Sequence, residues 1–187
     1  MELKEILEIR RAYRSLAPAP VTEDLIKDLA NCAKVAPSCF NHQAWRFVFV
    51  HEAETLGKLF TAMSEGNEWT QRASMIIAVF SEKSLDCQVK GREYYLFDTG
   101  MAVGFLLLRA TELGLVAHPI AGFDEVKVKK ILQIPGNMIL ITLIIVGKKS
   151  GQISPLLSKK MAQVEKERPP RKDFSQFAYL NTLEPGT

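Results

Sequence analysis

The chain has 187 residues, of which 47% are hydrophobic and 24% charged, and its formal net charge is +3 at pH 7. These proportions are typical of a folded globular protein and exclude wholesale disorder, a collagen-like fibre and a coiled coil. The charge balance is too mild to indicate nucleic-acid binding, so we expect no nucleic-acid partner. The longest strongly apolar run, 138–146, is far shorter than the ~20 residues of a membrane helix. Residues 1–11 lack the apolar core of a secretory signal, so we expect no membrane association and a cytoplasmic location.

Hydrophobic spacing predicts the secondary structure in chain order. A helix is expected over 2–14, and a second helix follows the N-cap residue Thr22 and stops at Pro37. The remaining predicted elements are a strand at 46–50, a helix at 52–64, a strand at 75–80, a helix at 91–113, a strand at 115–120, a helix at 124–132, a strand at 139–146 and a helix at 155–165. This order indicates mixed α/β layers, an α+β arrangement.

The predicted chain divides into a domain and a tail. We expect one folded domain over 1–165. Residues 166–187 contain prolines and few aliphatic side chains, so they cannot build a core of their own. We expect this tail to wrap over the body or over a partner subunit.

The predicted helix at 91–113 is apolar on nearly all sides, which is typical of a buried helix. Gly100 and Gly104 lie four residues apart within it, and each glycine costs a helix about 1 kcal/mol relative to alanine. Two glycines on one face indicate the close approach of another element. That element belongs either to the core of the same chain or to a partner at a subunit interface. Gly114 is expected to end the helix in the left-handed conformation.

Several common site motifs are missing from the sequence. No predicted strand is followed by G-x-G-x-x-G or G-x-x-x-x-G-K-[ST], so a Rossmann or P-loop nucleotide site has no support. The cysteines, Cys32, Cys39 and Cys87, include no C-x-x-C pair, which excludes a zinc ribbon and a thioredoxin-type motif. The three histidines form no H-x-x-x-H pair. We therefore expect no dedicated metal site.

Two basic clusters could bind an anion. Arg10, Arg11 and Arg14 lie within five residues of one another, and the planar guanidinium group binds phosphate through two parallel hydrogen bonds. A solvated basic helix end is the alternative, because cations also favour a helix C-terminus. A second cluster lies at 166–172, where a solvated run of charges is the usual interpretation.

Two further segments offer uncharged polar groups. In the loop at 36–45, Ser38, Asn41 and Gln43 can donate and accept hydrogen bonds, which suits sugar hydroxyls or the edge of a heterocycle. Trp45 could hold this loop in place, and an ordinary turn-rich connection is the alternative. At 118–123, Gly122 allows close backbone approach to a planar cofactor, and a simple strand-end turn is the alternative. We interpret His118 as a packing or surface residue rather than as a base.

Together these segments resemble the nitroreductase family of FMN-dependent oxidoreductases. The resemblance rests on R-R-x-x-R, A-P-S-x-x-N-x-Q-x-W, P-I-x-G and a final K-x-R, and it extends from residue 9 to about residue 174. It implies a central, mostly antiparallel sheet flanked by helices, in an intertwined homodimer with FMN bound at the interface.

The resemblance also implies which residues bind the cofactor. Basic side chains would meet the FMN phosphate and ribityl chain, polar loop residues would approach the flavin from the neighbouring subunit, and a strand end would line the isoalloxazine ring. The implied residues are Arg10, Arg11, Arg14, Lys166 and Arg168 for the first group, Pro37, Ser38, Asn41 and Gln43 for the second, and Pro119, Ile120, Ala121 and Gly122 for the third. No catalytic side chain is implied.

The implied activity is transfer of a hydride from NADH or NADPH through bound FMN to a small organic acceptor by a ping-pong mechanism. A nitroaromatic, a quinone or a flavin could be the acceptor. A narrower reduction, such as dehalogenation, is a related alternative. A flavin-binding protein with a sensing, storage or specialised role and little NAD(P)H turnover is an alternative of another class, and a structural protein with a decayed site is a further one. The flavin pocket is expected to be either open or covered by residues 64–73, where Trp69 and Arg72 are candidate substrate contacts.

Overall fold

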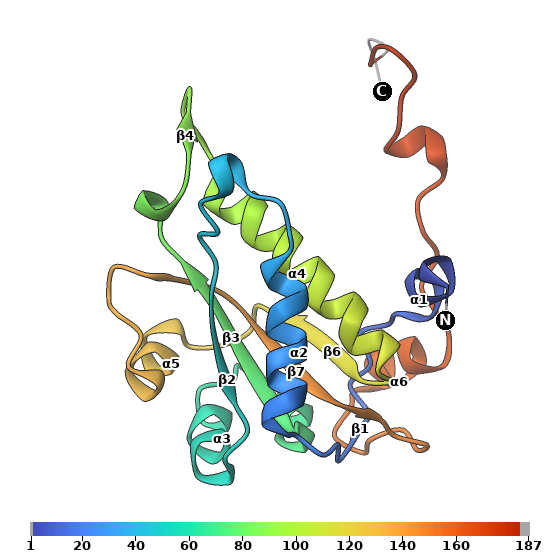
Figure 1. The fold of residues 1–187 in the computed structure, drawn as a ribbon. Helices are drawn as coiled ribbons and strands as arrows, with labels where there is room; N and C mark the ends of the chain where they lie inside the picture. The colour runs from blue at the N-terminus through green and yellow to red at the C-terminus, as the bar shows by residue number, and fades with distance from the viewer. Residues whose placement is uncertain (1, 184–187) are drawn as a thin grey trace.

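A five-stranded antiparallel sheet forms the centre of the molecule, with helices on both faces (Figure 1). The computed structural model describes residues 2–183. The long strand β7 pairs with β3, β6 and β1, and β3 pairs in turn with β2. The strands are β1 (Leu16–Ala17), β2 (Arg46–Val50), β3 (Met75–Ser81), β6 (Val116–Ile120) and β7 (Ile139–Lys149). The predicted fold class, a mostly antiparallel sheet flanked by helices, is confirmed.

Six α-helices and one short hairpin complete the part of the chain that the structure describes. The helices are α1 (Leu3–Ile9), α2 (Glu23–Lys34), α3 (Ala53–Phe60), α4 (Tyr94–Glu112), α5 (Glu125–Leu132) and α6 (Lys159–Lys166). The hairpin joins β4 (Gln88–Val89) and β5 (Arg92–Glu93). Across the described residues, none of the helices is long and apolar enough to span a membrane.

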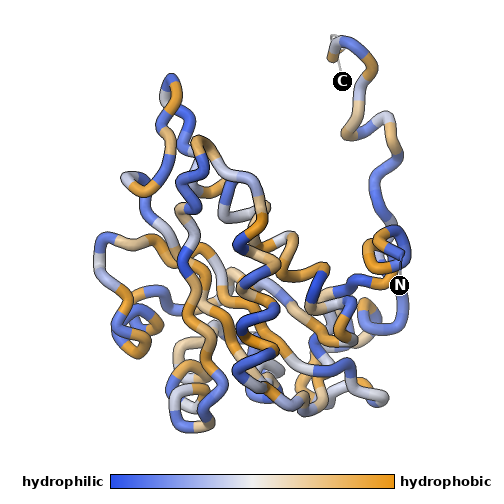
Figure 2. The backbone as a smooth tube through the Cα atoms, in the orientation of Figure 1, coloured by the Kyte–Doolittle hydropathy of each residue, from blue (hydrophilic) through white to orange (hydrophobic). Residues whose placement is uncertain are grey.

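The sheet is buried on both faces, and its strands run through the most apolar part of the chain (Figure 2). Successive side chains of a strand point to opposite faces, so the central strands supply two cores. On β3, Ile76 and Ala78 face the core completed by α3 and α5, whereas Met75 and Ile77 face the core completed by α2 and α4. This two-sided burial explains why the strand sequences are continuously apolar instead of alternating.

Several predicted helix ends are confirmed by their caps. The Thr22 side chain accepts a hydrogen bond from the Leu25 N–H at 3.2 Å, and the Asp124 side chain accepts one from the Lys127 N–H at 3.0 Å. Gly114 follows α4 with φ +73°, the left-handed conformation that its position requires.

Four predicted helices are too long at one end. The helix expected over 52–64 ends at Phe60. The helix expected over 2–14 ends at Ile9, because the next residues are drawn into extended contacts with α6. The helix expected from residue 91 begins at Tyr94, because the preceding residues form the β4–β5 hairpin. The helix expected over 155–165 begins at Lys159, after the N-cap residue Ser158.

Helix α4 is buried on one face only, contrary to the expectation from its apolar sequence. Its outer face exposes Leu96, Phe97 and Phe105, with Phe97 at 62% exposure. A Cβ placed on Gly100 or Gly104 would meet no atom of the described residues within 4 Å. Tight packing inside this chain is therefore not the reason for the glycine pair.

The tail leaves the body after α6 and extends away from it (Figure 1). Its large apolar side chains are exposed, and they include Phe174, Phe177, Leu180 and Leu183. The described part of the tail thus does not wrap over the body. Residues 184–187 of the predicted tail and residue 1 of the predicted domain lie outside the described residues.

Candidate functional site

The two basic clusters of the sequence form one pocket beside α1 and α6. The pocket has a volume of about 190 Å³, and its lining includes Arg10, Arg11, Arg14, Arg168 and Arg171. No acidic residue is among the described residues that line it. Burial lowers the pKa of Arg10, and the nearby positive charges of Arg168 and Arg171 act in the same direction. Such a concentration of guanidinium groups favours an anion.

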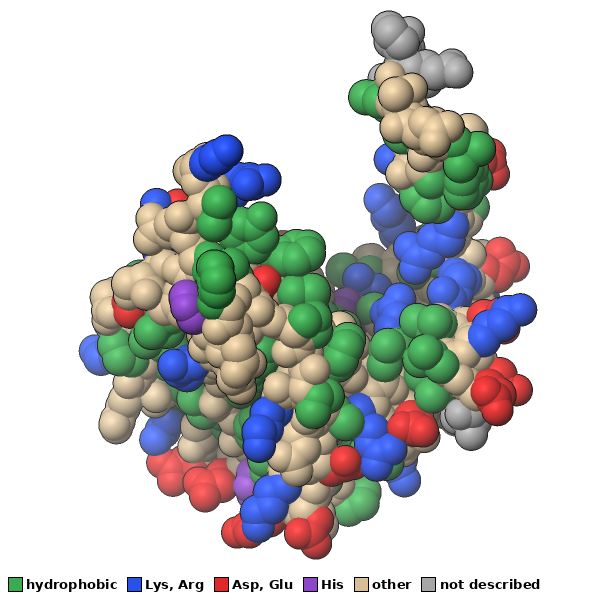
Figure 3. Space-filling model, turned by 45° about the horizontal axis from the view of Figure 1, so that its top comes forward, with side chains coloured by type: hydrophobic (Ala, Val, Ile, Leu, Met, Phe, Trp, Pro, Cys, Tyr) green, Lys and Arg blue, Asp and Glu red, His purple; other side chains and the backbone are tan. Residues whose placement is uncertain are grey.

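Hydrogen bonds to the backbone hold the pocket together. Arg168 donates to the carbonyl of Glu8 and, at 2.8 Å, to that of Arg10. Arg11 donates to the Val164 carbonyl at 2.6 Å, so part of its guanidinium group is already used. In Figure 3, Lys and Arg side chains gather between the body and the tail.

A buried glutamate fixes the chain next to the pocket. The Glu165 carboxylate accepts hydrogen bonds from the backbone N–H of Arg14 at 2.8 Å and of Ser15 at 3.1 Å. These bonds give the Arg14 and Ser15 N–H groups partners outside α1, and the chain leaves the helix after the Arg10 N–H has bonded to the Ile6 carbonyl. Sequence reasoning missed Glu165 because no local pattern distinguishes it from an ordinary helix carboxylate.

His118 lies beneath the pocket and stacks on Trp69, with ring centroids 4.9 Å apart. Burial lowers the pKa of His118 to about 4, and the positive charge of Arg14 lowers it further. The contact of Nδ1 with the Tyr13 carbonyl at 3.1 Å acts in the opposite direction and raises the pKa. His118 is therefore neutral at neutral pH and packs in the interior, as its sequence context predicts.

The expected substrate contacts of the 64–73 segment need correction. Trp69 is completely buried, so its side chain cannot reach a substrate as the sequence analysis expects. Its place against His118 shows that it belongs to the core. Arg72 lines a separate cavity of about 690 Å³ together with Leu16 and His51.

The strand end at 119–122 contacts the 64–73 segment. The Gly122 carbonyl accepts hydrogen bonds from the Asn67 side chain at 2.9 Å and from the Ser64 N–H at 3.1 Å. A Cβ at Gly122 would lie 2.4 Å from Asn67 Nδ2, so glycine is required by this close approach. Ile120 is buried in the core, while Pro119 is half-buried and Ala121 exposed.

The polar loop after α2 has a strained backbone. Phe40, Asn41 and Gln43 have φ values of 45°, 61° and 51°, in the left-handed region that side-chain-bearing residues seldom adopt. Ser38 Oγ accepts a hydrogen bond from the Gln43 N–H at 3.0 Å, which closes the loop. Residues held in such conformations cluster at functional sites, so the geometry supports a binding role for this loop.

The structure anchors this loop at both ends. Trp45 is buried in the core between the sheet and α2–α4, as the sequence analysis expects. The Cys39 N–H donates to Asp98 Oδ2 at 2.6 Å, and a disulfide joins Cys39 to Cys87. Burial raises the pKa of Asp98, and the neighbouring Asp86 carboxylate raises it further. Sequence analysis missed the disulfide because a separation of 48 residues forms no recognisable motif.

The structure brings together part of the predicted site. Arg10, Arg11, Arg14 and Arg168 share one pocket, and Arg171 joins them although it was not among the predicted residues. Lys166 lines a different cavity with Ser15 and Glu165. Arg171 belongs to the basic cluster at 166–172, so its positive charge was visible in the sequence.

The polar loop lies far from this pocket within one chain. The loop contacts the beginning of α4 through Asp98, whereas α1 packs near Phe105 and Leu108 in the later part of that helix. Figure 1 shows the same separation along α4. The predicted residues Pro37, Ser38, Asn41 and Gln43 therefore do not meet the arginine pocket of their own chain.

Fold and site together define an antiparallel α+β protein with an anion pocket formed by its two ends. The nitroreductase family model matches residues 7–68 and 62–148. A protein of Xanthomonas oryzae pv. oryzae (strain PXO99A), named "Putative NADH dehydrogenase/NAD(P)H nitroreductase", is 30% identical over 145 residues, which cover 67% of this chain and 74% of that protein. The chain therefore belongs to the nitroreductase family.

Solved structures show the same fold. The crystal structure of an "oxidoreductase containing FMN" gives a TM-score of 0.83 at 24% identity and covers 96% of this chain and 91% of that one. A structure from Exiguobacterium sibiricum 255-15, described as a "putative nitroreductase in complex with FMN", gives a TM-score of 0.71 at 21% identity and covers 82% and 92%. Both are similar in fold over most of this chain.

Proposed function

We propose that the protein is an FMN-dependent oxidoreductase that transfers a hydride from NADH or NADPH to a small organic acceptor such as a nitroaromatic, a quinone or a flavin. The observation that carries this proposal is the arginine pocket, because it joins the two basic clusters of the family pattern. The names of relatives that contain FMN or use NAD(P)H support the same assignment.

The pocket fits the phosphate end of FMN. A phosphate group presents several anionic oxygens, and guanidinium groups bind them through charge-assisted hydrogen bonds. Arg10, Arg14, Arg168 and Arg171 line the pocket, with no carboxylate competing for them among the described lining residues. We assign Arg11 a partly structural role in phosphate binding, because its guanidinium group also donates a hydrogen bond to the Val164 carbonyl. Lys166 is the least supported of the proposed phosphate ligands, since it lines the neighbouring cavity.

When bound, FMN supplies a two-electron carrier that can be reduced by a nicotinamide and reoxidised by a second substrate in a ping-pong cycle. The strand end at 119–122 offers main-chain groups to the ring, and Ser38, Asn41 and Gln43 offer uncharged hydrogen-bonding groups from a partner. The buried His118 is neutral at neutral pH and therefore adds no positive charge near Arg10 and Arg14. No side chain is assigned as a nucleophile or general acid.

We further propose that the active form is an intertwined homodimer. The polar loop and the arginine pocket are separated along α4, so one chain alone does not complete the proposed site. The exposed apolar face of α4 and the exposed aromatic side chains of the tail provide surface for a second copy. In this proposal the domain 1–165 binds FMN together with Arg168 and Arg171 at the start of the tail 166–187, and the rest of the tail wraps over the partner.

The phosphate assignment is tested by FMN titration of the apoprotein. Arg10→Ala and Arg14→Ala should each weaken FMN binding by about 1.5–3 kcal/mol, roughly 10- to 150-fold, because each removes a charge-assisted hydrogen bond. Quenching of flavin fluorescence measures the dissociation constant. Lys58→Ala on α3 is the control, since it removes one exposed positive charge far from the pocket lining. Unchanged affinity in both arginine variants would contradict the assignment.

A further inference from the structure

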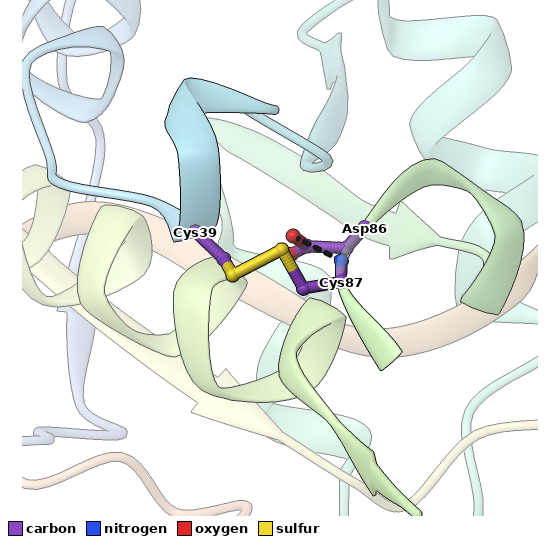
Figure 4. Close-up of side chains that lie close together, drawn as sticks. All are labelled: Cys39, Asp86 and Cys87. Carbon is purple, nitrogen blue, oxygen red and sulfur yellow. Dashed lines mark hydrogen bonds between the residues drawn. A yellow bond between two sulfur atoms is a disulfide. The ribbon is translucent and has the colours of Figure 1, made fainter. Parts of the chain in front are cut away.

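A cluster of metal-ligand side chains lies outside the proposed flavin contacts. Cys39 and Cys87 form a disulfide, and Asp86 lies beside it (Figure 4). One carboxylate oxygen of Asp86 and the two sulfur atoms all lie within 4.8 Å of one another. His42 lies beside this group, with Nδ1 at 3.5 Å from Asp86 Oδ1 and 3.9 Å from Cys87 Sγ, and its ring must move closer to Cys39 to serve as a fourth ligand.

We propose that this cluster binds one Zn²⁺ ion when the Cys39–Cys87 disulfide is reduced, with Cys39, Cys87, His42 and Asp86 as ligands. Thiolate, imidazole and carboxylate are the ligands that zinc takes in tetrahedral protein sites, at bond lengths of about 2.0–2.3 Å. Ligand atoms at the corners of such a tetrahedron lie roughly 3.3–3.8 Å apart. The distances of 3.5 Å and 3.9 Å from His42 Nδ1 to its two neighbours are close to this range.

The charge of the cluster favours a cation. The Asp86 side chain is completely buried, and its Oδ2 has no hydrogen-bond partner among the described residues. The buried Asp98 carboxyl adds a second acidic group beside it. Among the described residues, neither of these two carboxyl groups forms an ion pair with a lysine or arginine. A buried carboxylate without a compensating charge is costly, and a zinc ion would supply that charge.

The cluster is accessible from the protein surface. His42 has 43% of its side chain exposed, and Cys39 is half-buried in the loop that crosses the beginning of α4. A reductant can therefore approach the disulfide from the loop side. The two sulfur atoms must then move apart, because zinc-bound thiolates are not bonded to each other.

The chemistry balances with a dithiol as the reductant. Thiol–disulfide exchange breaks the Cys39–Cys87 bond, and the dithiol gives two electrons and two protons as it becomes a disulfide. Zn²⁺ then displaces the two thiol protons, which pass to solvent. A disulfide oxidant reverses both steps and releases the ion. The site is thus a zinc site whose occupancy depends on the redox state of its own ligands.

Zinc analysis of the full-length protein tests the proposal. The oxidised protein and protein reduced with a phosphine are each dialysed against Zn²⁺, and bound metal is measured by mass spectrometry. About one zinc per chain is expected in the reduced form and none in the oxidised form. Equal zinc content in both forms, or none in the reduced form, would overturn the proposal.

Variants and a second metal identify the ligands. Cys87→Ser and Asp86→Asn should each weaken zinc binding at least about tenfold, whereas Cys32→Ser should retain it, because Cys32 is the free cysteine on α2. Co²⁺ added to the reduced wild-type protein should give a thiolate-to-cobalt charge-transfer band, a readout that needs no variant to fold. A cobalt spectrum without this band, or equal loss of zinc in Cys32→Ser and Cys87→Ser, would also contradict the proposal.

Discussion

Glu165 shows how one side chain can join distant parts of the sequence. Its carboxylate binds the backbone of Arg14 and Ser15, and this contact brings the N-terminal arginines to the start of the tail. Arg168 completes the link by donating to the Arg10 carbonyl at 2.8 Å. The proposed phosphate pocket is therefore fixed by contacts to the backbone, including those of the Arg11 and Arg168 side chains. Among the described residues, the side chains of Arg10 and Arg14 donate no hydrogen bond, so they remain available for a ligand.

The buried His118 should make stability depend on pH. Its pKa is lowered from 6.5 to about 4 in the folded state, so below pH 6.5 the unfolded state takes up a proton that the folded state does not. The stabilisation is fully present above pH 6.5 and is lost progressively as the pH falls to about 4. Between pH 7 and pH 5, this group alone should cost about 2 kcal/mol of the free energy of unfolding.

Urea unfolding of His118→Gln at the two pH values measures this effect. The variant should lose about 2 kcal/mol less than the wild type between pH 7 and pH 5, because its side chain does not titrate. His51→Gln is the control, since that histidine is exposed. An equal pH dependence in the wild type and His118→Gln would show that His118 does not carry the effect.

At the residue scale, the sequence shows the chemistry of both basic clusters but not their position in the fold. The structure brings Arg10, Arg11, Arg14 and Arg168 to one pocket, and their binding of a phosphate stays a prediction. The place of Lys166 in a neighbouring cavity and of Trp69 in the core was not predictable, since both depend on contacts between distant segments. The Cys39–Cys87 disulfide was missed for the same reason.

At the scale of elements, β7 organises the sheet and α4 provides its largest uncovered surface. The strand β3 was predicted to within one residue, because its continuous apolar run is decided by burial on both faces. The start of β7 was also predicted, but this strand continues to Lys149, three residues beyond the apolar run at 139–146. The ends of α1 and α4 were predicted less well. Tertiary contacts of Glu165 and the β4–β5 hairpin replaced the helical turns that local propensity favours.

The uncovered face of α4 predicts an effect on assembly. In an isolated chain, a Cβ at position 104 would have no described atom within 4 Å, so leucine would fit there. Replacing glycine by leucine would also stabilise the helix by roughly 1 kcal/mol. At a dimer interface the same side chain would prevent close packing of the partner. We expect Gly104→Leu to shift the protein from dimer to monomer in sedimentation velocity experiments.

Gly57→Leu on α3 provides a matched control for this experiment. Its Cβ also lies in open space, so it tests a leucine on a helix outside the proposed interface. The control should leave the dimer intact. A monomeric wild type, or a Gly104→Leu dimer as stable as that of the control, would be incompatible with an interface at α4.

The tail gives an independent prediction about the same interface. Combined replacement of Phe174, Phe177 and Leu180 by serine should weaken the dimer by more than about 3 kcal/mol, over 100-fold, if a partner buries these side chains. The concentration dependence of sedimentation reports the dissociation constant. Val126→Ser on α5 is the control, because Val126 is 78% exposed in the body. Dimers of equal strength in both proteins would show that the tail lies elsewhere.

At the scale of the whole molecule, the antiparallel α+β fold and membership of the nitroreductase family were predicted correctly from the sequence. The family motifs made this possible, because they extend over nearly the whole chain. How the motifs assemble was not visible in the sequence. The polar loop and the arginine pocket lie apart along α4, and this separation is the main structural reason to propose a site shared by two chains.

The central claim is that bound flavin exchanges electrons with a nicotinamide, and an anaerobic absorbance spectrum tests it most directly. The spectrum of the FMN-loaded protein is recorded before and after addition of NADH, and separately of NADPH. We predict a bound-flavin spectrum whose visible absorbance is bleached by at least one of the two nucleotides. A protein that does not bind added FMN, or a bound flavin that neither nucleotide reduces, would contradict the proposed function.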